Sequence, residues 1–261
     1  ALGELIAEKS GVLNLGVEGM MLEGAISGFI AAATTGSIVL AVFCGMLAGA
    51  ATALIFAVLT LTLLANQVAS GLALTIFGVG LSAFLGLDYT SVALPGIPEI
   101  NIPFLSSIPL IGPLLFSYDP LIYLSFIFFA AICWFLYRSR PGLILRAIGE
   151  SPRSGHALGY SVIRIRYFAV LFGGAMAGMG GVYLVVAYTP MWVEGMTAGR
   201  GWISLALVVF ATWRPARIIL GAYLFGSVTI AQFHAQGLGI EVPVQFLSML
   251  PYIATIVVLV L

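Results

Sequence analysis

The chain has 261 residues, and only 20 of them are charged, 10 Lys or Arg and 10 Asp or Glu, so its formal net charge is zero. Charged residues make up 8% of the chain and hydrophobic residues 61%, whereas a soluble domain carries about 25% charged residues. This composition excludes a water-soluble globule, because too little polar surface is available to cover a core, and it excludes a nucleic-acid-binding protein.

Long apolar stretches predict an all-α fold, a polytopic transmembrane helical bundle. The stretches run for about 18–27 residues, long enough for a helix to cross a bilayer, and they lack the alternation of barrel strands. We expect about eight spans or half-spans, at 15–34, 38–64, 68–86, 120–137, 167–188, 202–213, 216–235 and 245–261. Since the chain starts without methionine and stops inside an apolar run, we expect both ends to be cut and a first transmembrane helix to be missing.

Two of these stretches predict broken or re-entrant helices. The stretch 202–213 is too short to cross a bilayer alone, and the stretch 15–34 is interrupted by Gly16, Glu18, Gly19, Glu23 and Gly24. Irregular backbone at membrane depth is tolerated only where protein or a watery cavity surrounds it.

The charges predict the orientation, because Lys and Arg near span ends stay on the cytoplasmic side. Residues 10–137 contain no Lys or Arg and five acids, while residues 138–166 contain six Arg and one Glu. We therefore expect the loop 138–166 to be cytoplasmic and the acidic, proline-rich loop 87–119 to be external and irregular. The short basic turn 213–217 falls on the cytoplasmic side by the same count.

Small residues at four-residue spacing predict close helix packing. They occur as Gly24-x-x-x-Gly28, Gly45-x-x-x-Gly49 and Gly174-x-x-x-Gly178. Such faces let two backbones approach, either within a packed bundle or at a subunit contact.

Five polar residues are candidates for a solute pathway: Asn14, Glu18, Glu23, Asn66 and Gln67. A charged group inside a span is costly unless it faces a cavity or a partner. Glu18 either lines a pathway or accepts N–H bonds from an exposed helix start. Glu23 lies about 140° further round a helix, so we expect no carboxylate pair and favour a structural role for it. Asn14, Asn66 and Gln67 are either pathway hydrogen-bonders or helix caps, and caps are favoured.

Motifs for catalysis are missing. No phosphate loop precedes Lys9, which is the only lysine, and there is no H-E-x-x-H, no G-x-S-x-G and no Cys/His cluster. Cys44 and Cys133 each lie in an apolar run, as buried thiols do. We expect neither an enzyme active site nor a metal or cofactor site.

The cytoplasmic loop predicts one short helix. Ser151-Pro152 favours a helix start with Pro152 in the first turn, and Gly159 favours its end. A short helix held between two spans suits a subunit that receives force from a separate cytoplasmic motor, although a merely solvated basic loop has the same composition.

Four segments in chain order carry a family resemblance: 4–21, 66–74, 146–159 and 199–210. Together they resemble the permease subunits of bacterial ABC importers of the branched-chain amino acid, simple-sugar and nucleoside group. The opening E-x-x-G-V-L-N-L-G-V-E-G-M-M looks most like the nucleoside and simple-sugar branch served by basic-membrane-protein-type lipoproteins.

The resemblance implies a multi-pass protein of the bacterial plasma (inner) membrane, with residues 1–261 forming one transmembrane permease domain. Its partners would be an ABC ATPase subunit, a second related permease in a heterodimer, and an extracellular substrate-binding lipoprotein. The loop 138–166 would carry the coupling helix that docks on the ATPase, formed by Glu150, Ser151, Pro152, Arg153, Ala157 and Gly159. The chain departs from the family by lacking the usual first helix, and it has Glu150-Ser-Pro where many other ABC permeases have E-A-A.

We therefore predict a permease subunit that moves nucleosides or simple sugars delivered by an extracellular binding protein. The alternative is a self-sufficient carrier or channel driven by an ion gradient, which the acids at membrane depth would suit. A third interpretation, a membrane scaffold without transport, is disfavoured by the interrupted spans.

Overall fold

The computed structural model describes residues 1–98, 100–101 and 117–237, together with residues 249, 253 and 256. The helices are α1 (Leu2–Lys9), α2 (Val17–Thr35), α3 (Ile38–Ala57), α4 (Gln67–Gly86), α6 (Pro120–Arg138), α7 (Arg140–Glu150), α8 (Pro152–Ala157), α9 (Val162–Tyr183), α10 (Arg200–Phe210) and α11 (Pro215–Gly237). Short segments extend three of them, π-helical η1 (Val58–Thr62), 3-10-helical η2 (Leu87–Tyr89) and π-helical η3 (Leu184–Tyr188). This architecture confirms the predicted all-α class.

The strands in the described residues are a two-residue antiparallel pair, β1 (Ile100–Asn101) and β2 (Ser117–Tyr118). Both lie within the predicted external loop 87–119. Residues 99 and 102–116 of that loop lie outside the described residues.

Four helical segments are long and apolar enough to cross a membrane: Ile38–Thr62, Gln67–Tyr89, Pro120–Arg138 and Val162–Tyr188. Each coincides with a predicted span, except that the fourth begins at Val162 rather than at residue 167. The earlier start includes Arg164 and Arg166, whose long side chains can keep their charge near the interface while their stems pack on apolar surface. The predicted span 245–261 lies outside the described residues apart from positions 249, 253 and 256.

The predicted interruption of the span 15–34 is wrong for Glu18, Gly19, Glu23 and Gly24, which lie inside the continuous helix α2, and only Gly16 falls in non-helical backbone. Gly19 and Gly24 allow α4 and α9 to approach closely and do not interrupt the helix.

α1 precedes residues 10–16, which are not helical, and α2 follows them. We call residues 10–16 the break. The sequence analysis did not predict α1, because its eight residues carry Glu4, Glu8 and Lys9 and do not read as an apolar span.

The centre of the bundle is built from α2, α3 and α9, which approach through glycines. A Cβ built on Gly24 would lie 2.2 Å from the Cα of Gly178, and one built on Gly49 would lie 2.2 Å from the carbonyl oxygen of Gly174. Real Cβ atoms essentially never come closer than 3.0 Å to such neighbours, so only glycine allows this packing. The predicted small-residue faces therefore pack on one another within the chain.

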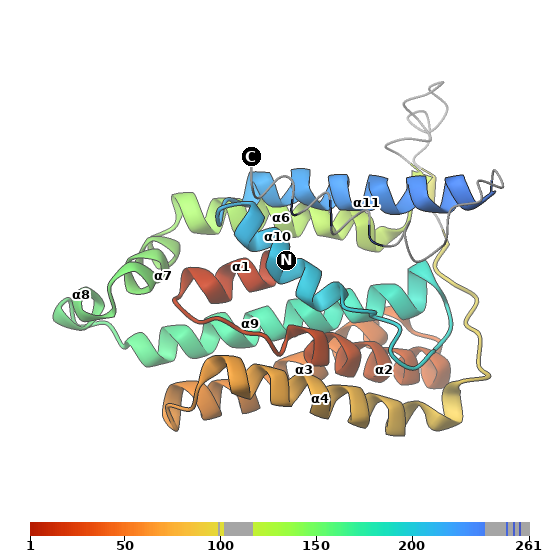
Figure 1. The fold of residues 1–261 in the computed structure, drawn as a ribbon, viewed down its shortest axis with the longest axis horizontal. Helices are drawn as coiled ribbons and strands as arrows, with labels where there is room; N and C mark the ends of the chain where they lie inside the picture. The colour runs from red at the N-terminus through yellow and green to blue at the C-terminus, as the bar shows by residue number, and fades with distance from the viewer. Residues whose placement is uncertain (99, 102–116, 238–248, 250–252, 254–255, 257–261) are drawn as a thin grey trace.

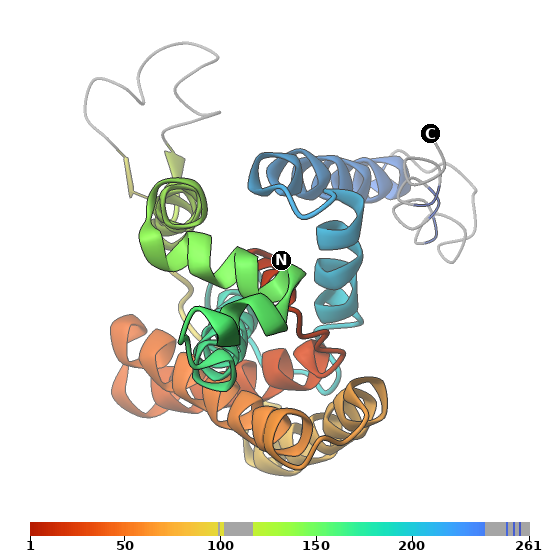
Figure 2. The same ribbon diagram turned by 90° about the vertical axis from the view of Figure 1, so that its left-hand side faces the viewer.

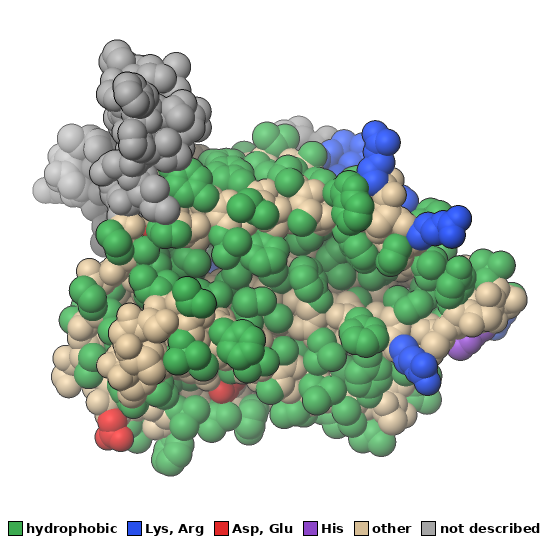
Figure 3. Space-filling model, turned by 180° about the vertical axis from the view of Figure 1, so that it is seen from behind, with side chains coloured by type: hydrophobic (Ala, Val, Ile, Leu, Met, Phe, Trp, Pro, Cys, Tyr) green, Lys and Arg blue, Asp and Glu red, His purple; other side chains and the backbone are tan. Residues whose placement is uncertain are grey.

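The long helices lie roughly side by side, while α7 and α8 project from one end of the bundle (Figures 1 and 2). Lys and Arg side chains gather at that same end, and hydrophobic side chains cover most of the face seen in Figure 3. We call the end of the bundle that carries α7, α8 and these Lys and Arg side chains the basic end. An apolar surface of this kind (Figure 3) is typical of a protein that lies in a bilayer, and the segment predicted to be cytoplasmic, 138–166, carries α7 and α8 at the basic end.

Candidate functional site

Hydrogen bonds from three helices hold the break, and they engage part of its non-helical backbone, as irregular backbone at membrane depth requires. The bonds run from Leu13 N to Gln67 Oε1 (2.9 Å), from Asn14 N to Glu4 Oε1 (3.3 Å), from Thr75 Oγ1 to Leu15 O (3.1 Å), from Trp202 Nε1 to Leu15 O (3.3 Å) and from Gly16 N to Asn14 Oδ1 (3.0 Å). The partners on other elements belong to α1, α4 and α10, which fix the start of α2.

Asn14 and Gln67 both accept hydrogen bonds from backbone N–H groups of the break. Asn14 is fully buried; its Oδ1 accepts from Gly16, and its Nδ2 lies 3.3 Å from the sulfur of Met20. Gln67 is half-buried at the start of α4 and accepts the Leu13 N–H. The structure thus brings these two predicted residues to one place, in contacts typical of structural hydrogen-bonders.

Glu18 begins a second link, to the short helix α10. One carboxylate oxygen accepts from the Thr197 hydroxyl (2.5 Å) and from Gly199 N (2.8 Å), and the other accepts from Gly201 N (2.6 Å). These donors form the N-terminus of α10, whose unpaired N–H groups and dipole favour a negative charge. Glu18 therefore makes the contacts that its capping interpretation predicts, although the helix it caps lies about 180 residues away in the sequence.

Space at this contact is provided by Gly201. A Cβ there would lie 2.5 Å from the Cα of Glu18. Arg200 points elsewhere: its Nη1 donates to the Met196 carbonyl at 3.0 Å, and its guanidinium lies 5.6 Å from the centre of the Tyr188 ring. Thr197 and Gly201 were missed by the sequence analysis, although Gly201 lies within the segment 199–210 that carried the family resemblance.

Glu23 and Asn66 stand apart from this cluster. Glu23 is buried in α2 with 5% of its surface exposed, and its Oε1 has no hydrogen-bond partner among the described residues. Asn66 is exposed and caps α4, its side chain accepting from Ala69 N at 3.0 Å. The cap interpretation accounts for the contact of Asn66, and no contact accounts for Glu23.

At the basic end, α8 is the predicted short helix. Ser151 caps it, accepting from Ser154 N at 3.3 Å, Pro152 occupies its first turn, and Gly159 follows its end with a φ of +80°. Arg153 and Ala157 are exposed, as is Glu150 at the end of α7. The helix α7 itself was not predicted; Ser139 caps it and Pro141 lies in its first turn.

The helices α7, α8 and α9 pack through a glycine. A Cβ on Gly155 of α8 would lie 2.8 Å from Cγ1 of Ile148 on α7 and 3.2 Å from Cγ2 of Val162 on α9. The helix α8 therefore packs directly on α7 and α9, with no space for a side chain at Gly155.

The end of α1 is wedged against α7 and α9, directly before the break. A Cβ on Gly149 would lie 2.1 Å from the carbonyl oxygen of Lys9, and Arg166 Nε donates to the carbonyl of Ser10 at 3.0 Å. Gly149 and Arg166 were not singled out from the sequence, since nothing local marks a contact with residues more than 130 positions away.

Comparison with known proteins identifies the family of the chain. The family described as the branched-chain amino acid transport system / permease component matches residues 1–259. A protein of Haloferax volcanii provisionally named as a glucose ABC transporter permease protein is 42% identical over 99% of this chain and 85% of its own length. The nucleoside ABC transporter permease protein of Lactococcus lactis is 35% identical over 100% of this chain and 86% of its own.

A third relative is the guanosine ABC transporter permease protein of Bacillus subtilis. It is 31% identical over 99% of this chain and 86% of its own length. No solved structure matches the chain significantly.

Proposed function

The chain belongs to the branched-chain amino acid transport system permease family of ABC importers, and we propose that its solute is a neutral polar molecule, a nucleoside or a simple sugar. It is a multi-pass membrane protein and a transport subunit, so ATP is hydrolysed by a partner ATPase and the solute arrives on a binding protein. We further propose a second related permease subunit, in the plasma membrane of a prokaryote, with residues 1–261 forming one permease domain.

The contacts of Glu18 support a neutral solute. The N-terminus of a half-helix inside a membrane protein is a ready site for an anionic group of a substrate. In this chain the N-terminus of α10 is already occupied by the Glu18 carboxylate through three hydrogen bonds. A carboxylate-bearing solute such as an amino acid finds no such anion site there, whereas a nucleoside or sugar does not need one. The named relatives support the same solute classes, glucose, nucleosides and guanosine.

For the pathway we propose a division of roles among the five predicted residues. Asn14 and Glu18 hold the break and α10 in place, because their polar atoms are engaged within the protein. Gln67, Asn66 and Glu23 are the members of the set that retain polar atoms for a solute. Asn66→Leu and Gln67→Leu should lower nucleoside uptake while ATPase stimulation by the binding protein stays normal. Unchanged uptake would leave Asn66 as a helix cap and Gln67 as a structural hydrogen-bonder of the break.

For coupling we propose that the ATPase moves α8 and that the motion reaches the break through Gly149 and Arg166. The residues Glu150, Ser151, Pro152, Arg153, Ala157 and Gly159 form the docking surface. Motion of α8 shifts α7 through the close contact at Gly155. The helix α7 in turn contacts the carbonyl oxygen of Lys9 through Gly149. Since Ser10 begins the break, the shift changes the position of Glu18 and with it α10.

The function is tested by reconstituting the complete complex and measuring uptake of radiolabelled guanosine, glucose and leucine. We expect uptake of a nucleoside or the sugar only with ATP and the binding protein present. Leucine uptake would overturn the proposed solute class. Uptake by this chain alone, driven by a proton or sodium gradient without ATPase, would instead establish the ion-driven carrier.

The docking surface has its own test. The double substitution Glu150→Arg and Gly159→Arg should abolish ATP-driven uptake, because both positions flank the exposed face of α8. Intact complex assembly together with intact uptake in this variant would refute the coupling assignment.

A further inference from the structure

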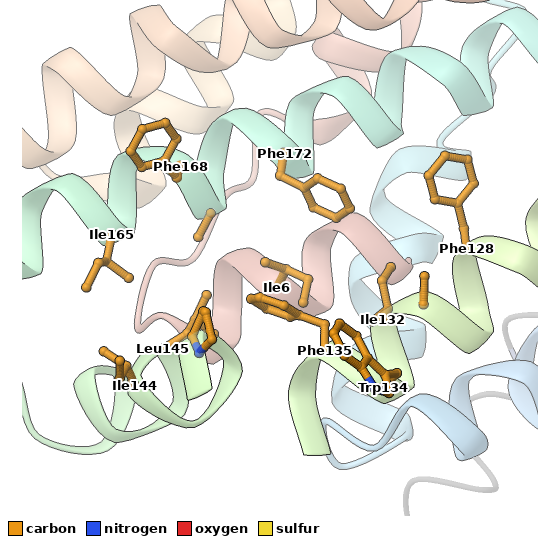
Figure 4. Close-up of a pocket in the computed structure, with 13 residues that line it drawn as sticks. Ile6, Phe128, Ile132, Trp134, Phe135, Ile144, Leu145, Ile165, Phe168 and Phe172 are labelled. Atoms are coloured by element: carbon orange, nitrogen blue, oxygen red, sulfur yellow. The ribbon is translucent and has the colours of Figure 1, made fainter. Parts of the chain in front are cut away.

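An apolar groove of about 700 Å³ lies between α6 and α9, with α7 closing its end toward the basic end of the bundle. Phe128, Trp134 and Phe135 of α6 face Phe168 and Phe172 of α9 across it, and Ile6 of α1 lies at its floor (Figure 4). We call it the α6–α9 groove. None of its lining residues belongs to the predicted pathway set or to the proposed docking residues.

The α6–α9 groove opens toward the bilayer. Trp134 and Phe168 on its two walls are 64% and 73% exposed, whereas Ile6 and Ala169 deeper in the groove are 4% and 2% exposed. The exposed walls and buried floor describe a furrow on the lipid-facing surface, into which an acyl chain can settle.

The length of the groove matches one leaflet. From Arg138 at the end of α6 to Phe128 is ten residues, about 15 Å of helix at a rise of 1.5 Å per residue. That is half of the roughly 30 Å hydrocarbon core of a bilayer. A chain whose headgroup lies at the level of Arg138 therefore ends near Phe128 and Phe172.

Three exposed arginines lie near lining residues in the sequence, at the end of the groove toward the basic end. Arg138 follows Trp134 by about one helical turn, Arg140 is adjacent to the lining residue Pro141, and Arg164 is adjacent to the lining residue Ile165. All three arginines are exposed, and the single acid in residues 138–166 is Glu150. Basic residues between spans at the cytoplasmic interface are typical of sites for anionic lipid headgroups.

We propose that the α6–α9 groove binds one anionic phospholipid of the cytoplasmic leaflet, with an acyl chain between Phe128, Phe135 and Phe172 and the headgroup phosphate at Arg138, Arg140 and Arg164. The headgroup supplies the selectivity, because lipid tails are as apolar as the groove and an acyl chain gains no hydrophobic free energy by entering it. Each arginine near an anionic surface contributes about a fivefold preference.

Trp134 serves as the reporter. The complete transporter complex is placed in nanodiscs of phosphatidylcholine containing 20% brominated phosphatidylglycerol or 20% brominated phosphatidylcholine, and tryptophan quenching is measured. Subtracting the signal of Trp134→Phe assigns the quenching to this side chain. We expect quenching of Trp134 by the brominated phosphatidylglycerol to exceed that by brominated phosphatidylcholine at least about fivefold in apparent affinity.

Matched variants locate the site. Ala131→Phe fills the groove, and Ala130→Phe adds the same side chain at the neighbouring exposed position of α6 that does not line it. The preference should be lost in Ala131→Phe and in the double variant Arg138→Gln and Arg140→Gln, and kept in Ala130→Phe. Equal quenching by the two lipids would mean that the groove contacts bulk lipid without selecting a headgroup. Quenching by neither lipid would mean that protein fills the groove. Either result overturns the proposal.

Discussion

The substitution Gly149→Ala tests whether motion passes from α7 to α1. The added Cβ would lie 2.1 Å from the Lys9 carbonyl oxygen, and ordinary contact begins at 3.4 Å, so α7 and the end of α1 have to separate by about 1.3 Å. Overpacking of this kind costs about 1–3 kcal/mol. The gain from replacing a helical glycine by alanine is at most about 1 kcal/mol.

Gly226→Ala is the matched control, since a Cβ at this glycine of α11 would meet nothing within 4 Å. Gly226→Ala has only the stabilising effect of alanine in a helix. The two variants should therefore differ by about 1–3 kcal/mol in the free energy of the conformations in which α7 contacts the end of α1. A coupling free energy of that size changes the equilibrium between two coupled states by about 5–150-fold.

The assay is the number of solute molecules taken up per ATP hydrolysed, in proteoliposomes containing the complete complex. We expect Gly149→Ala to lower this ratio at least about fivefold while the complex still assembles and hydrolyses ATP, and Gly226→Ala to keep it. An unchanged ratio in Gly149→Ala would refute transmission through this contact. Equal loss of assembly, ATPase activity and uptake would assign Gly149 to packing alone.

Three further outcomes follow from single contacts. Glu18→Gln removes the charge at the start of α10 and should destabilise the protein by about 1.5–3 kcal/mol, the range for hydrogen bonds to charged groups, measured as a lower melting temperature; an unchanged melting temperature would contradict the cap. Gly178→Ala would drive a Cβ to 2.1 Å from the Gly45 carbonyl oxygen and should sharply reduce the yield of folded protein, whereas Gly80→Ala, with open space around it, should not. Ser151→Ala removes the cap of α8 at a cost of about 0.5–2 kcal/mol and should weaken ATPase binding, with Ser151→Thr retaining it; equal binding by both variants would show that the cap is dispensable.

Several features of the fold can be predicted from the sequence because they depend only on residues that are adjacent along the chain. A hydrophobic stretch of span length predicts a helix wherever it packs, so the four long segments were located closely from composition alone. The start of α8 was predicted from Ser151-Pro152 for the same reason, because a cap acts on the helix that directly follows it. The polar helices α1 and α7 escaped prediction, since neither carries a long apolar stretch.

What the sequence by itself determined is a helical membrane protein with a basic segment at residues 138–166 and a resemblance to importer permeases. Only the tertiary structure decided that Glu18 caps α10, that Gly149 bears on Lys9 and that aromatic side chains of α6 and α9 line one groove. These contacts join residues far apart in the chain. Their partners are chosen by how whole helices pack, and hydropathy and local motifs carry no information about that choice.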